Sequence, residues 1–330
     1  MNKPKVCIIF TGGTISMTVD EEIGAAIPTL SGEQILSMVY NIDKIADIEV
    51  VNFSEIPGPH MTINKLLELK KLIIEKLNEE DITGVIVTHG TDTLEETAYF
   101  LDLTINHEKP VVVVGAMRSS SELGYDGSSN LAAAVCTAIS PKAKNKGVLV
   151  VLNNEVNAAA EVTKTNTLSL NTFQSPYGPL GIIDTNDFIV YRDIAYRQHI
   201  DTDVVERKVD LIKAVLDMDE RFIRSSVDLG AVGIVIEAMG RGNVSPKMLE
   251  GIRYAIDKGV VVVIVSRCNS GRVFESYGYA GGGKELSDLG VIMGSDMRGP
   301  KARLKLMLAL GKTKDINKIH EIFKEENYDL

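Results

Sequence analysis

Two polar loops carry the residues of this sequence that are best suited to chemistry. A Thr-Gly-Gly-Thr motif at residues 11–14 directly follows the apolar run 6–10, and a His-Gly-Thr-Asp-Thr motif at 89–93 directly follows the run 84–88. A threonine hydroxyl can act as a nucleophile once a neighbouring base takes its proton. Both loops also have a purely structural interpretation, because Thr14 can satisfy a tight Gly-Gly turn and Asp92 can cap a helix.

Neither loop has the pattern of a common phosphate-binding site. The first turn lacks the G-x-G-x-x-G pattern of dinucleotide-binding proteins, and neither loop ends in the Gly-Lys-Ser/Thr of a P-loop. The 5 histidines are scattered, and no HExxH motif or carboxylate cluster stands at metal-ligand spacing. We therefore predict neither a cofactor nor a metal.

Short apolar runs alternate with helix-period segments through the first half of the chain. We predict strands at residues 6–10, 48–53, 84–88, 111–115 and 148–152. Their uniform apolar character is typical of parallel strands that are buried on both faces. In the common 2-1-3-4-5 strand order, ligands bind between strands one and three. This order would make Thr14 and Thr91 face each other across one crevice.

Helix starts are marked by capping residues. Ser31 with Gln34 and Thr93 with Glu96 form capping-box patterns, and Thr62 precedes an amphipathic run. A second alternating set follows later in the chain, with strands at 211–216, 233–237, 260–266 and 291–294 and helices at 246–257, 300–310 and 315–325. The fold class is therefore α/β with two domains, in which a larger N-terminal domain has a doubly wound, mainly parallel sheet.

We place the N-terminal domain and its proposed catalytic residues at 1–191, a polar linker at 192–210, and the smaller C-terminal α/β domain at 211–330. Two domains fit a chain of 330 residues, because single hydrophobic cores stop growing at about 250 to 300 residues.

The composition limits which binding partners and which cellular compartment can be predicted. A net charge of -10 repels phosphate backbones, so a nucleic-acid partner is not predicted. No apolar run approaches the roughly 18 residues of a membrane span, and the N-terminal run is too short for a signal-peptide core. Cys7, Cys136 and Cys268 each lie in or beside a predicted buried segment and are interpreted as core residues. These features predict a cytoplasmic protein.

Several motifs, taken together, resemble the bacterial L-asparaginase and glutaminase-asparaginase family. The resemblance covers nearly the whole chain in one order, through residues 11–14, 89–93, 115–118 with Asp126, Gly127 and Asn130, 162–167, 177–181 and 301–303. It implies hydrolysis of free L-asparagine to L-aspartate and ammonia, and it leaves open a glutaminase side activity.

The resemblance also implies roles for single residues. Thr14 matches the nucleophile that forms an acyl-enzyme, and Thr91, Lys164 and Asp92 match a second triad that moves protons. Which threonine attacks first is debated within the family. Asp92 also matches the residue that binds the substrate ammonium.

Ser54 and Glu55 match a pair that grips the α-substituents of the substrate. Asn243 matches a residue lent to the site of a neighbouring subunit, within a homotetramer built from tight dimers or a homodimer. A second lent residue, a glutamate, has no counterpart that we can place in residues 278–283.

One departure concerns the segment after Thr14. Family members carry there a mobile loop with a tyrosine that assists the nucleophile, whereas residues 16–30 contain no tyrosine. Gly24 and the small residues around it still suit a lid.

Two alternative functions follow from the sequence. The missing tyrosine is compatible with an amino-acid-binding regulatory homologue that has lost turnover. The same fold also occurs in a subunit of tRNA-dependent amidotransferases, which would be expected to carry an extra N-terminal domain.

Overall fold

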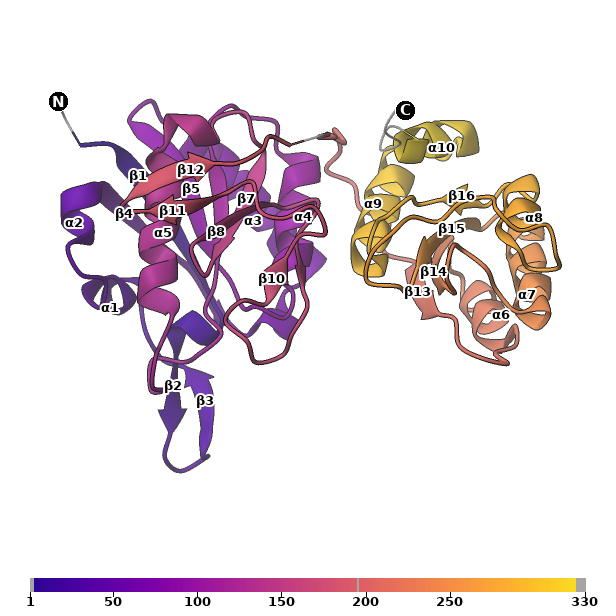
Figure 1. Cartoon of the computed structure of the whole chain (residues 1–330), viewed down its shortest axis with the longest axis horizontal. Helices are drawn as coiled ribbons and strands as arrows, with labels where there is room; N and C mark the ends of the chain where they lie inside the picture. The colour runs from indigo at the N-terminus through magenta and orange to yellow at the C-terminus, as the bar shows by residue number, and fades with distance from the viewer. Residues whose placement is uncertain (1–2, 195, 325–330) are drawn as a thin grey trace. The chain divides into compact units, whose positions relative to one another are not determined.

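The computed structural model describes residues 3–194 and 196–324, and it divides into two compact units, Met1–His199 and Ile200–Leu330 (Figure 1). Each unit has its own sheet and is described here by itself. The division falls inside the segment 192–210 predicted as a linker, and the limits of that linker and of the domains 1–191 and 211–330 stay a prediction.

The first unit is built on an eight-stranded sheet with the order β12-β11-β8-β7-β6-β5-β1-β4. The strands are β1 (Lys5–Gly12), β4 (Asp47–Ile56), β5 (Ile82–Thr88), β6 (Val111–Val114), β7 (Val148–Leu152), β8 (Glu155–Ala158), β11 (Gly181–Asp184) and β12 (Asp187–Val190). β4, β1, β5, β6 and β7 are parallel, and the three strands beyond β7 are antiparallel. The predicted 2-1-3-4-5 order and the mainly parallel sheet are confirmed.

The central strands of this sheet, β1, β5, β6 and β7, are buried on both faces, as uniformly apolar strands require. Val6, Ile8 and Phe10 of β1 share a core with Leu131, and the alternate residue Ile9 is equally buried. The helices of the unit are α1 (Gly32–Ser37), α2 (Ile42–Ile45), α3 (Ile63–Leu77), α4 (Leu94–Thr104) and α5 (Gly127–Ile139). The parallel strands are therefore held rigidly, with their carboxyl ends at one edge.

The three predicted helix starts are confirmed, and two of them are capped by the side chain of the residue before the helix. Ser31 forms the capping box with Gln34, and the Thr62 side chain accepts a hydrogen bond from the Lys65 amide. The capping box predicted at Thr93 is wrong, although α4 does begin at Leu94. The Thr93 hydroxyl instead donates to the Gly58 oxygen, 2.7 Å away. A hydrogen bond between two loops has replaced the local helix cap.

Two antiparallel pairs interrupt the α/β pattern. Residues 16–30, predicted as a lid, form the hairpin of β2 (Met17–Asp20) and β3 (Ala25–Pro28), which projects from the first unit in Figure 1. A second pair joins β9 (Thr163–Lys164) and β10 (Phe173–Gln174). The unit also contains 3-10 turns at Thr14–Ser16, Gly58–His60 and Pro141–Ala143.

The second unit has a parallel four-stranded sheet in the order β13-β14-β15-β16. Its elements are β13 (Val209–Lys213), α6 (Arg221–Asp228), β14 (Gly233–Ala238), α7 (Pro246–Asp257), β15 (Val261–Ser266), α8 (Gly283–Asp288), β16 (Ile292–Met293), α9 (Gly299–Lys312) and α10 (Ile316–Lys324). The predicted smaller α/β domain is confirmed. The last residue of the helix predicted at 315–325 lies outside the described residues.

The cysteines divide into two kinds. Cys7 and Cys136 are buried as predicted, and burial raises the pKa of Cys7 to about 12. Cys268 is exposed, so its assignment to a core is wrong, because β15 ends at Ser266 and the chain has left the sheet. Among the described residues, no helix is long and apolar enough to cross a membrane.

Candidate active site

Three loops at the carboxyl ends of β1, β4 and β5 come into backbone contact. Gly13 and Gly12 have φ values of 86° and 107°, a conformation that favours glycine. A Cβ atom on Gly13 would lie 2.4 Å from the Gly90 nitrogen, and one on Gly90 would lie 2.5 Å from the Gly58 nitrogen. Thr14 and Thr91 directly follow the contacting glycines, so the sheet brings both threonine loops to one place.

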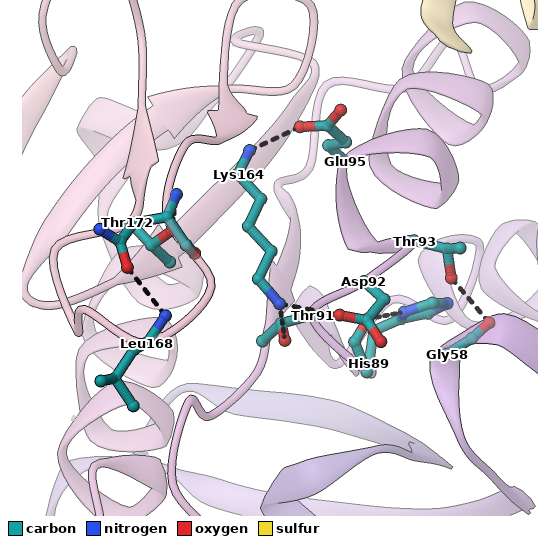
Figure 2. Close-up of polar contacts among 11 residues, drawn as sticks. Gly58, His89, Thr91, Asp92, Thr93, Glu95, Lys164, Leu168 and Thr172 are labelled. Atoms are coloured by element: carbon teal, nitrogen blue, oxygen red, sulfur yellow. Dashed lines mark hydrogen bonds and ion pairs between the residues drawn. The ribbon is translucent and has the colours of Figure 1, made fainter.

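Lys164 joins the Thr91 loop from a distant part of the chain (Figure 2). Its Nζ lies 2.9 Å from the Thr91 Oγ1 and 2.8 Å from an oxygen of Asp92. Thr91 is 6% exposed and the Lys164 side chain 18%, whereas the Asp92 side chain is 63% exposed. A hydroxyl, an amine and a carboxylate thus form a contiguous set in which only the carboxylate is open to solvent.

The backbone of Lys164 is also held in place by hydrogen bonds. The Lys164 amide donates to a carboxylate oxygen of Glu95, 2.7 Å away in the first turn of α4, as Figure 2 shows. β10 pairs with Lys164 through Phe173, and the amide of Thr165 bonds to the Thr172 oxygen at 2.8 Å. The side chain is therefore stretched between two anchored ends, which limits the positions its amine can reach.

His89 supports the same loop from the interior. Its Nδ1 lies 2.8 Å from the Gly90 oxygen, which can only accept, so Nδ1 carries the ring hydrogen. The Nε2 atom then accepts from the Thr97 hydroxyl at 2.9 Å. Burial lowers the pKa of His89 to about 4, so the ring is neutral at pH 7. His89 positions the loop as a fixed neutral tautomer.

Thr14 lies half-buried on its own 3-10 turn, whose start is fixed by the Ser16 hydroxyl donating to the Gly13 oxygen at 2.8 Å. Within residues 3–194 and 196–324, the Thr14 hydroxyl makes no hydrogen bond to another residue. The hydroxyl that contacts the Lys164 side chain is therefore that of Thr91, and no basic side chain is hydrogen-bonded to Thr14 in the described part of the chain.

The predicted substrate-binding residues lie in two places. Ser54 is half-buried near the end of β4 and donates to the Thr11 oxygen at 2.9 Å, and Glu55 beside it is exposed. Both adjoin the loop that holds Thr14. Asn243 belongs to the second unit, where its Oδ1 accepts from the Gly283 amide at 3.3 Å. Thr14, Thr91, Asp92, Lys164, Ser54 and Glu55 all belong to the first unit.

Sequence reasoning missed the residues that support this set. Glu95 bonds to a residue 69 positions away, and Glu161 pairs with Arg192 to hold the chain just before β9. Neither pair has a local pattern that could reveal it. In the described parts of the chain, no group of three or more His, Cys, Asp or Glu residues could hold a metal ion.

Comparison with known proteins covers both units. The protein-family model of the asparaginase N-terminal domain matches residues 5–196 of the sequence. The family model of the glutaminase/asparaginase C-terminal domain matches residues 208–323. The chain is 41% identical to an L-asparaginase of Bacillus licheniformis, over 96% of this chain and 98% of the relative.

Two further relatives carry other names. The chain is 37% identical to a probable periplasmic L-asparaginase of Haemophilus influenzae, over 98% of this chain and 93% of the relative. It is 31% identical to a glutaminase-asparaginase of Pseudomonas fluorescens, over 97% of this chain and 90% of the relative. Fold, site and relatives together define an α/β enzyme of the amidohydrolase class. Within that class, the chain belongs to the asparaginase family.

Proposed function

We propose that this protein is an L-asparaginase that hydrolyses L-asparagine to L-aspartate and ammonia with Thr14 as its nucleophile. The observation that carries the proposal is the contact of Lys164 Nζ with both Thr91 and Asp92, beside the Gly13–Gly90 contact that brings in the turn of Thr14. The names of the relatives support the substrate, and one of them makes glutamine the second amide to assay.

In the proposed reaction, the Thr14 oxygen attacks the carbon of the side-chain amide. The C–N bond breaks, and the proton of the hydroxyl leaves with ammonia. Water then cleaves the ester, which releases aspartate and restores the hydroxyl. Thr91, Lys164 and Asp92 move the protons in both steps. Because Lys164 Nζ donates to Thr91 Oγ1, the hydrogen of Thr91 remains to be donated to substrate or water.

The ends of the substrate can be assigned from hydrogen-bonding capacity. Ser54 uses its only hydrogen on the Thr11 oxygen, so it can offer a ligand only lone pairs. Asp92 and Glu55 are also acceptors, and Asp92 is open to solvent. Three acceptors suit the substrate ammonium, and we propose that backbone amides of the converging loops bind its carboxylate.

The decisive measurement is ammonia release from millimolar L-asparagine. Thr14→Ala is expected to lower kcat by roughly a thousandfold, since it removes the attacking atom. Lys164→Met is expected to lower it by roughly a hundredfold to ten-thousandfold through loss of proton transfer. Thr185→Ala is the matched control, because Thr185 is exposed at the turn between β11 and the edge strand β12, at the end of the sheet order opposite β4.

A Thr14→Ala variant as active as the wild type would refute the proposed nucleophile. A wild type that binds asparagine in calorimetry but releases no ammonia would instead support the regulatory binding protein.

We further propose a cytoplasmic enzyme that assembles as a homotetramer of two tight dimers, with Asn243 completing the site of a neighbouring subunit. Three cysteines without a disulfide fit a reducing compartment. Light scattering after gel filtration is expected to give about four chain masses of 35.9 kDa, and two would support a homodimer. Cell fractionation against a periplasmic marker tests the location.

A further inference from the structure

Tyr125 reaches the turn of Thr14 from a separate loop, 110 residues further along the chain than the residue it contacts. Its phenol oxygen lies 2.9 Å from the backbone oxygen of Ile15, which directly follows Thr14. A carbonyl oxygen can only accept, so the phenol donates this bond. The side chain of Tyr125 is therefore tied to the backbone one residue away from the proposed nucleophile.

The turn that receives this bond is short. Residues Thr14–Ser16 form a single 3-10 turn, and the Met17 amide closes it by donating to the Thr14 oxygen. The amide and the hydroxyl of Ser16 both bond to the Gly13 oxygen, at 2.9 and 2.8 Å. These bonds join near neighbours in the sequence. Tyr125 instead ties the turn to a different part of the fold.

The loop that carries Tyr125 is firmly anchored. The carboxylate of the next residue, Asp126, accepts from the amides of Met117 and Arg118 at 3.0 and 2.9 Å. It also accepts from the side-chain amide of Asn130 in α5, at 2.9 Å. Tyr125 thus extends from a closed loop fastened to a helix, which makes it a rigid support.

The ring of Tyr125 has a fitted place in this loop. A Cβ atom on Gly127 would lie 2.2 Å from the phenol oxygen and 2.5 Å from a ring carbon, so the ring rests directly on the glycine backbone. Burial raises the pKa of the phenol, which therefore remains a hydrogen-bond donor throughout the neutral range.

The same loop also holds the hairpin that follows the turn. The amide and hydroxyl of Ser120 donate to the Met17 oxygen at 3.1 and 3.0 Å, and the Ser121 hydroxyl accepts from the Val19 amide at 3.0 Å. The chain is thereby fastened at Ile15, Met17 and Val19, three alternate residues that follow Thr14.

We propose that Tyr125 is a positioning residue for Thr14, holding the Ile15 carbonyl so that the neighbouring hydroxyl stays aimed at the substrate amide. This inference rests on the proposed role of Thr14. Misplacing a reacting atom by about 1 Å can lower a rate by roughly a hundredfold. Substrate binding depends on other residues, so the effect is expected in kcat.

Tyr125→Phe is the test, because it removes one oxygen and keeps the ring on Gly127. We expect kcat for asparagine to fall by at least about tenfold, with KM within about twofold and an unchanged melting temperature. Gly127→Ala, which displaces the ring, is expected to lower kcat as well. Tyr40→Phe is the matched control, since Tyr40 is 88% exposed. A kcat of Tyr125→Phe within twofold of the wild type would overturn the inference.

Hydrogen–deuterium exchange without substrate gives a readout that does not depend on activity. The Ser16 and Met17 amides are expected to exchange faster in Tyr125→Phe than in the wild type and in Tyr40→Phe. Unchanged exchange would overturn the inference, whatever the rates show. A wild type that releases no ammonia would refute the proposed function instead, and the exchange experiment would still decide whether Tyr125 holds the turn.

Discussion

At the scale of single residues, His89 links the stability of the site to pH. Its ring is buried, neutral and bonded on both nitrogens, and burial lowers its pKa to about 4. In the unfolded chain the same ring takes a proton near pH 6.5. Between these values the unfolded chain binds more protons than the folded one, so the free energy of unfolding decreases as the pH falls.

We therefore expect the contribution of His89 to the free energy of unfolding to be complete above about pH 6.5 and to be lost progressively as the pH falls to about 4. The loss by pH 4.5 is expected to be about 2 to 3 kcal/mol. Urea unfolding followed by circular dichroism, at about pH 7.5 and about pH 4.5, measures it as the difference between wild type and His89→Gln. His60→Gln is the control, because His60 is exposed. Equal pH dependence of wild type and His89→Gln would contradict the assignment.

The polar loops and the family resemblance together predicted the candidate site, but neither predicted the contacts that hold it. Thr14, Thr91 and Lys164 stand out through their motifs, and the fold places Lys164 against Thr91. The bond from the Lys164 amide to Glu95 spans 69 residues, and Tyr125 bonds across 110. Such contacts depend on the packing of whole elements, so a local pattern cannot reveal them.

At the scale of elements, the site depends on how closely three loops approach one another. Gly13 needs both a positive φ and free space, Gly90 needs only space, and Gly24 in the hairpin has a φ of 66° with nothing within 4 Å. Alanine at these three positions separates the two requirements. An alanine forced to a positive φ costs about 1 kcal/mol, whereas a backbone clash must move a loop.

We expect Gly13→Ala and Gly90→Ala to lose asparaginase activity by at least about a hundredfold. Alanine at 13 would clash with Gly90 and separate the two threonine loops, and alanine at 90 would clash with Gly58 and displace the Thr91 loop. Gly24→Ala is expected to stay within about threefold of the wild type, with a small decrease in melting temperature. Initial rates and thermal unfolding measure both effects. Wild-type activity in a folded Gly90→Ala variant would show that the close approach of Gly90 to Gly58 is not needed for catalysis.

Elements with strong local signals were predictable, and those held by distant partners were not. β1, β5, β6 and β7 are short, almost wholly apolar runs, and their burial leaves few possible orders for the sheet. β9 and β10 are two residues each, and their pairing depends on the loop between them. The sequence of the β2–β3 hairpin suggested only a lid, since its strands are mostly half-exposed and need the loop of Ser120 to hold them.

At the scale of the whole molecule, net charge distinguishes an enzyme for a free amino acid from a subunit that works on charged tRNA. The chain carries a net charge of -10, whereas asparagine at neutral pH is a zwitterion without net charge. Long-range attraction therefore contributes little to the encounter of enzyme and substrate. An RNA partner would instead have to overcome repulsion between two polyanions.

Asparagine hydrolysis is accordingly expected to be almost independent of ionic strength. Salt screens interactions between exposed charges that lie further apart than the Debye length, and a substrate without net charge has little such interaction to lose. Between about 50 mM and about 500 mM NaCl, kcat/KM should therefore change by less than about twofold. Fluorescence anisotropy with labelled tRNA at low salt should show no binding by the same preparation. Saturable tRNA binding that weakens steeply with added salt would favour the amidotransferase subunit, since that dependence reports release of counterions from phosphates.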